Sequence, residues 1–169
     1  PASTGVIGCN GSGNWDGPLG WDGHAVFNEI LGKDGGDPNF FIFRADGKIK
    51  VPGSGQYSFH VRHDDDVWVW IDANGNSKID SGEARNRGGW SRRNYINNFL
   101  RVNLKPGSVK FAIVLYEHAG GEHVQMRMAG PGSNGSIDIP KSMLQGVNTK
   151  GKDGNKNDYN NARNASGGW

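Results

Sequence analysis

Apolar side chains along this chain fall in short runs that alternate with polar ones, which is the period of a half-buried β-strand. Tyr57, Phe59 and Val61, for example, alternate with polar neighbours and therefore share one face. Segments rich in Gly, Pro, Asn and Asp separate the runs and predict turns. Short strands at this spacing predict an all-β fold, namely an antiparallel, jelly-roll-like β-sandwich with long loops and little helix. The predicted strands are Phe40–Arg44, Lys48–Val51, Gln56–Arg62, Val67–Asp72, Phe99–Leu104, Val109–Tyr116, Glu122–Met128 and Ser136–Ile139.

Both ends of the chain lack this alternation. Residues 1–38 are rich in Gly and Trp, and their pattern allows one short helix at His24–Leu31. Residues 147–169 have no apolar period and many Asn, Gly and Lys, which predicts a polar tail or linker. We therefore expect a single β-sandwich domain at residues 1–146.

The strand at residues 67–71 differs from the others because both of its faces are apolar. Its valines and isoleucine are expected to face the core, which leaves Trp68 and Trp70 on the opposite face. Two interpretations of these tryptophans are open. Either the N-terminal segment or the loop around Trp90 covers them, or they form an exposed aromatic platform for sugar rings.

Composition narrows the possible functions. The chain has 169 residues, and 28 of them are Gly without a collagen-like period, as in a turn-rich β protein. The net charge of +2 is too small to predict a nucleic-acid partner or an anionic membrane. No apolar run is long enough to cross a membrane, so membrane insertion is not expected. Cys9 is the only cysteine, which excludes an internal disulfide.

Oxygen-bearing side chains recur at alternate positions in the segment DANGNSKIDSGE, residues 72–83. They occupy positions 1, 3, 5, 9 and 12 of a twelve-residue loop, and a backbone carbonyl can serve position 7. Calcium takes six to eight oxygen ligands, which such a loop can supply. Position 6, where a turn glycine is expected, is Ser77, so the loop turns differently or Ser77 is left-handed. The alternative is a polar hairpin without an ion. The predicted ligands are Asp72, Asn74, Asn76, Lys78, Asp80 and Glu83.

A second group of carboxylates, Asp64, Asp65 and Asp66, precedes the same strand. Crowded carboxylates repel one another and resist burial, so they indicate a bound cation or a cage of hydrogen-bond donors. Adjacent residues on a regular strand point to opposite faces. Asp64 and Asp65 can therefore share one ion only if the peptide between them is unusual, for instance cis.

Several segments stand in an order that is characteristic of one family of domains. They are Gly47–Phe59, Asp64-Asp65, Val69–Asp72, Leu104–Gly107, Val114–Gly121 and Val124–Pro131. Through them the chain, over about residues 40–145, resembles the β-sandwich domain family named after a fragment of the anthrax protective antigen. In the lectin members, which include yeast and bacterial adhesins, a cis peptide joins the paired aspartates. These aspartates bind a calcium ion that coordinates sugar hydroxyls.

The resemblance implies a sugar site in which Asp64 and Asp65 are paired calcium ligands. A second loop, residues 117–122, would complete the site, since its glycines let backbone carbonyls reach the ion. Trp90 is expected to stack on the sugar ring. The residues expected to bind carbohydrate are Asp64, Asp65, Glu117, His118, Glu122 and Trp90.

These features predict a calcium-dependent carbohydrate-binding, lectin-like domain. It would belong to an extracellular or cell-surface adhesin or to a secreted polysaccharide-acting protein, with glycans or polysaccharide as partners. The alternative is a structural subunit or spacer of an extracellular assembly, which contacts other copies of itself or neighbouring modules and in which calcium only stabilises loops. An enzyme is not expected, because the loop carboxylates are better explained as metal ligands and no nucleophile motif is present.

Overall fold

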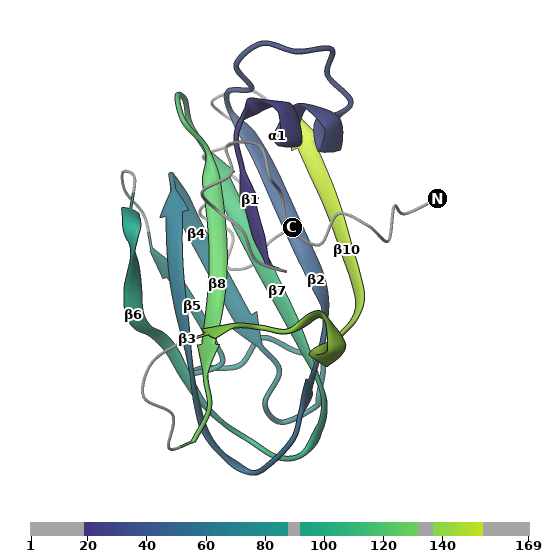
Figure 1. Ribbon diagram of the computed structural model, residues 1–169, viewed down its shortest axis with the longest axis vertical. Coiled ribbons are helices and arrows are strands. Elements are labelled where there is room, and N and C mark those ends of the chain that lie inside the picture. The colour runs from purple at the N-terminus through teal and green to yellow at the C-terminus, as the bar shows by residue number, and fades with distance from the viewer. Residues whose placement is uncertain (1–18, 88–91, 132–136, 154–169) are drawn as a thin grey trace.

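The computed structural model describes residues 19–87, 92–131 and 137–153, arranged as two β-sheets with one α-helix at the upper end (Figure 1). All strand pairs described are antiparallel. The predicted all-β sandwich is therefore confirmed. The elements are β1 (Gly20–Asp22), α1 (His24–Leu31), β2 (Phe41–Val51), β3 (Gly55–Asp64), β4 (Asp66–Ile71), β5 (Ala84–Arg87), β6 (Arg92–Leu104), β7 (Gly107–Glu117), β8 (His123–Ala129), β9 (Ile137–Asp138), the 3-10 helix η1 (Lys141–Met143) and β10 (Leu144–Asp153).

Consecutive strands alternate between the two sheets in several places. The first sheet has the order β1-β8-β3-β6, and β9 also pairs with β8. The second sheet has the order β10-β2-β7-β4-β5. The connections from β3 to β4 and from β7 to β8 are two of the places where the chain passes from one sheet to the other.

The core lies between the sheets and follows the alternation seen in the sequence. Tyr57, Phe59 and Val61 are all buried there, as their shared face predicts. The helix α1 has the predicted bounds, and its Phe27 ring packs 5.1 Å from Phe41 and 5.4 Å from Phe43, between ring centroids. Burial of large aromatic side chains from α1 and β2 thus ties the helix to the sandwich. No helix in the described residues is long and apolar enough to span a membrane.

The strand β4 is buried on both faces. Its Val67, Val69 and Ile71 belong to the core between the sheets, whereas Trp68 and Trp70 belong to a separate apolar cluster. The tryptophans are only 2% and 8% exposed, so an exposed aromatic platform is wrong. Residues 1–18 and Trp90, which were expected to cover them, lie outside the described residues.

Two predictions about β2 and the C-terminal segment need correction. The predicted strands 40–44 and 48–51 are one continuous strand, because Gly47 pairs with Phe111 of β7 instead of forming a turn. Residues 147–153, expected to begin a polar tail, form the second part of β10 and pair with β2. Backbone hydrogen bonds hold an edge strand without an apolar period, which is why the sequence pattern missed it.

Candidate functional site

Two of the crossings between the sheets, β3 to β4 and β7 to β8, lie side by side at one end of the sandwich. Asp64, the last residue of β3, pairs with His123 at the start of β8. Asp66, the first residue of β4, pairs with Tyr116 near the end of β7. The connection through Asp65 therefore lies next to the loop that joins β7 to β8. The topology brings together the two loops that the sequence analysis assigned to one site.

Direct contacts join the two loops. The backbone N–H of His118 donates to Oδ2 of Asp65 over 2.9 Å. A Cβ atom on Gly121 would lie 3.7 Å from Oδ2 of Asp64, which shows that the loop passes close to this carboxylate. The peptide between Asp64 and Asp65 is cis, as the family resemblance implied. The carbonyl oxygen of Asp65 accepts a hydrogen bond from Nδ1 of the buried His63.

Three carboxylates converge at this point. One oxygen from each of Asp64, Asp65 and Glu117 lies within 4.8 Å of the other two. The aspartates are half-buried, while Glu117 is fully buried and neither of its carboxylate oxygens has a hydrogen-bond partner. Burial raises the pKa of Glu117 to about 10, and the charges of Asp65, Asp64 and Glu122 add to the shift. Such a group resists simultaneous ionisation, so it needs either a proton on Glu117 or a cation.

The second loop is also held by residues that the sequence analysis missed. The N–H of Phe40 donates to the His118 carbonyl over 3.0 Å, and the N–H of Gly120 donates to Oδ1 of Asn39 over 3.3 Å. The Phe40 ring meets the His118 ring edge-on at 4.8 Å, and Phe40 has a left-handed φ of 57°. Asn39 and Phe40 lie far from this loop in the sequence, and no local pattern marks them. Residues 118–121 are exposed above the buried Glu117.

The family described as PA14 domain matches residues 22–141 of the chain. The chain belongs to the PA14 domain family. The resemblance stated from the sequence motifs is thereby confirmed, and the match extends it towards the N-terminus to include α1. No curated protein matches this PA14 domain.

Solved structures similar to this PA14 domain include three with 15–17% sequence identity to it. The PA14 sugar-binding domain from an RTX adhesin has a TM-score of 0.47, with 62% of this chain and 53% of that chain covered. The PA14 domain of the antifreeze protein MpAFP has a TM-score of 0.46, with 70% and 56% covered. The epithelial adhesin 9 A domain from Candida glabrata, in complex with Galβ1-3GlcNAc, has a TM-score of 0.48, with 83% and 72% covered. This chain spans about half the length of the first of these structures.

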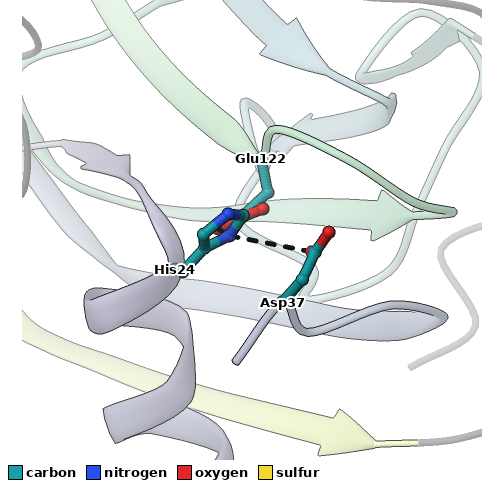
Figure 2. A group of neighbouring side chains, drawn as sticks. All are labelled: His24, Asp37 and Glu122. Carbon is teal, nitrogen blue, oxygen red and sulfur yellow. Dashed lines mark hydrogen bonds and ion pairs between the residues drawn. The ribbon is translucent and has the colours of Figure 1, made fainter. Parts of the chain in front are cut away.

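Glu122 lies in a second polar group of the PA14 domain. Figure 2 shows it facing His24 and Asp37, and Nδ1 of His24 is 2.7 Å from Oε1 of Glu122 and 3.7 Å from Oδ1 of Asp37. The Glu122 side chain is fully buried, and burial raises its pKa to about 7 although His24 acts in the opposite direction. Glu122 is therefore not among the carboxylates that converge at Asp64 and Asp65. Its predicted contact with a sugar is not supported by its burial.

The other predicted site residues of the PA14 domain have different positions. His118 is exposed on the second loop, as a ligand-binding residue requires, whereas Glu117 is buried beneath that loop and can reach an ion but not a sugar directly. Trp90 lies outside the described residues. The predicted calcium loop, residues 72–83, joins β4 to β5 at the opposite end of β4. Ser77 has a φ of 59°, which confirms the left-handed alternative for position 6.

Proposed function

We propose that this PA14 domain is a calcium-dependent carbohydrate-binding module of an extracellular adhesin or of a secreted polysaccharide-acting protein. The observation that carries the proposal is the convergence of Asp64, Asp65 and Glu117 beside an exposed, glycine-containing loop. Family membership supports the same conclusion, because PA14 domains include sugar-binding adhesin domains such as the one from the RTX adhesin.

The three carboxylates fit a calcium ion chemically. Calcium prefers carboxylate and carbonyl oxygens, and Glu117 offers two buried oxygens that have no hydrogen-bond donor. When bound, calcium would supply open coordination positions for two neighbouring hydroxyls of a sugar. Asp64 and Asp65 are half-buried, so they can hold an ion at the surface, while the buried Glu117 can balance its charge from below.

The second loop would provide specificity. Asp65 accepts a hydrogen bond from the His118 N–H and so fixes the loop against the carboxylate group. No atom lies within 4 Å of a Cβ added at Gly120, so this part of the loop leaves room for a ligand. The rings of Phe40 and His118 lie beside this space and offer an aromatic edge against the sugar.

Calorimetric titration of glycans into the full chain tests the proposal. The panel should hold simple monosaccharides and Galβ1-3GlcNAc, the ligand in the similar epithelial adhesin. We expect binding with calcium present and at least about tenfold weaker binding after chelation or in Asp65→Asn, because each change removes ion-mediated contacts. The matched control is Glu29→Gln, which removes an exposed carboxylate from α1 and should bind as the parent does.

Two outcomes would contradict the sugar proposal. Glycan binding that is unchanged by chelation and by Asp65→Asn would place the ligand elsewhere. Calcium binding without any glycan binding across a broad panel would instead favour a structural subunit or spacer, in which the ion only stabilises loops.

A further inference from the structure

The hairpin loop between β4 and β5 has a buried carboxylate at each end. Asp72 directly follows β4 and is 4% exposed, and Glu83 directly precedes β5 and is 7% exposed. The backbone closes the loop between them, since the Ile71 N–H donates to the Glu83 carbonyl over 2.9 Å. Carboxylates this deeply buried are rare unless a cation or several donors accompany them.

Each of these two carboxylates is only half satisfied. Oδ2 of Asp72 accepts the Ser77 N–H, and Oε1 of Glu83 accepts the Asn74 N–H, both over 3.0 Å. These contacts turn both carboxylates into the interior of the loop. The second oxygens, Oδ1 of Asp72 and Oε2 of Glu83, are buried and have no hydrogen-bond partner. Lys110, the nearby cation, donates to Oγ of Ser77 instead.

The outer half of the loop carries further side-chain oxygens. Oδ2 of Asp80 accepts from the side-chain amides of Asn74 and Asn76, each over 2.6 Å. The amide oxygens of Asn74 and Asn76 accept the backbone N–H groups of Asn76 and Lys78. The side-chain oxygens of the alternating pattern are thus held by N–H and amide groups of the same loop.

We propose that this loop binds a calcium ion whose role is to fasten the β4–β5 hairpin. The two unpartnered oxygens of Asp72 and Glu83 are its buried ligands, and Asp80 with Asn74 and Asn76 supplies the exposed ones. The two amides hold Asp80, and Asp80 does not share a close carboxylate group with Asp72 and Glu83. Calcium binding would exchange those amide hydrogen bonds for coordination and would draw Asp80 inward.

The role follows from the position of β5. Among the described strands, β5 pairs only with β4 and forms the edge of its sheet, so this pairing and the loop that closes the hairpin hold β5 in place. The sugar site lies at the other end of β4, about 20 Å away for six residues of strand. This calcium site is therefore independent of the proposed sugar site, and either can fail without the other.

The test removes the sugar-site ligands first. In the full chain carrying Asp65→Asn and Glu117→Gln, titration with calcium chloride should still show one bound ion. Adding Glu83→Gln should weaken calcium binding at least about tenfold, because it removes a charged ligand. Calcium should raise the melting temperature of the Asp65/Glu117 variant by several degrees, and this rise should disappear with Glu83→Gln.

Two further measurements keep the proposal falsifiable if Glu83→Gln does not fold. Asp80→Asn changes a half-buried side chain of the loop and should weaken calcium binding in the same background without unfolding the protein. Hydrogen exchange should slow at residues 84–87 when calcium is added. The proposal is overturned if the Asp65/Glu117 variant binds no calcium, or if Asp80→Asn leaves calcium affinity and the protection of β5 unchanged.

Discussion

Two glutamates of a single loop are buried in different surroundings. Glu117 faces two aspartates and no donor, so burial and like charges raise its pKa to about 10. Glu122 faces His24, whose ring offsets part of the effect, and its pKa rises only to about 7. The first environment suits a divalent cation, and the second suits a single proton or a charged histidine.

The raised pKa of Glu122 predicts a pH-dependent stability. Folded Glu122 keeps its proton up to about pH 7, whereas the unfolded side chain loses it near its ordinary pKa of 4.5. Its contribution to the free energy of unfolding is therefore complete below about pH 4.5 and is lost as the pH rises towards 7. The loss is at most about 3 kcal/mol.

Glu122→Gln should remove this part of the pH dependence. Urea unfolding at pH 5 and pH 8, in chelator, should show a smaller stability difference for the variant than for the parent protein. Glu29→Gln, at an exposed position on α1, is the control and should behave as the parent does. Equal pH dependence in Glu122→Gln and the parent would show that Glu122 is ionised in the folded protein throughout this range.

At the scale of elements, the packing at the start of β3 requires a glycine at its first residue, Gly55. A Cβ atom on Gly55 would lie 2.4 Å from Cγ of Pro131, and Gly55 has a φ of 149°. The proline ring is rigid, so β3 or the end of β8 would have to move to admit a methyl group.

Gly55→Ala should therefore destabilise the domain by about 1–3 kcal/mol. Gly53→Ala, two residues earlier, is a matched control because no atom lies within 4 Å of its added Cβ. Urea unfolding of both variants measures the difference. Equal stability of the two variants would contradict the close approach of Pro131 to Gly55.

Strands that bury a full apolar face could be predicted from the sequence, and polar edge strands could not. The alternation of β3, β7 and β8 reports burial directly, so their positions were predicted to within a few residues. The short β5 and the polar β10 are held by pairing with β4 and β2, and pairing leaves no periodic signal.

The candidate site divides in the same way. The paired aspartates and residues 117–122 could be found because the family motifs mark them. Asn39 and Phe40 could not, because they support the site only through contacts across the fold. The position of Glu122 was also beyond reach, since its partner His24 lies 98 residues away in the sequence.

At the scale of the whole molecule, β10 shields the open side of β2. Residues 148–153 of β10 pair with residues 41–46 of β2, and α1 packs against β10 (Figure 1). Gly151 allows this approach, because a Cβ atom there would lie 2.7 Å from Cδ2 of Leu31.

A protein fragment cut at residue 146, the boundary that the polar composition suggests, would lose this shield. The N–H and C=O groups along the first half of β2 would then be unpaired, and such an edge recruits strands from other chains. We expect this fragment to form dimers or larger species in sedimentation experiments, while the full chain shows less association at the same concentration. A monomeric fragment would mean that β10 is dispensable. The polar strand β10 would thus prevent a strand of another chain from pairing with β2, and it would do so through its backbone hydrogen bonds and without apolar side chains.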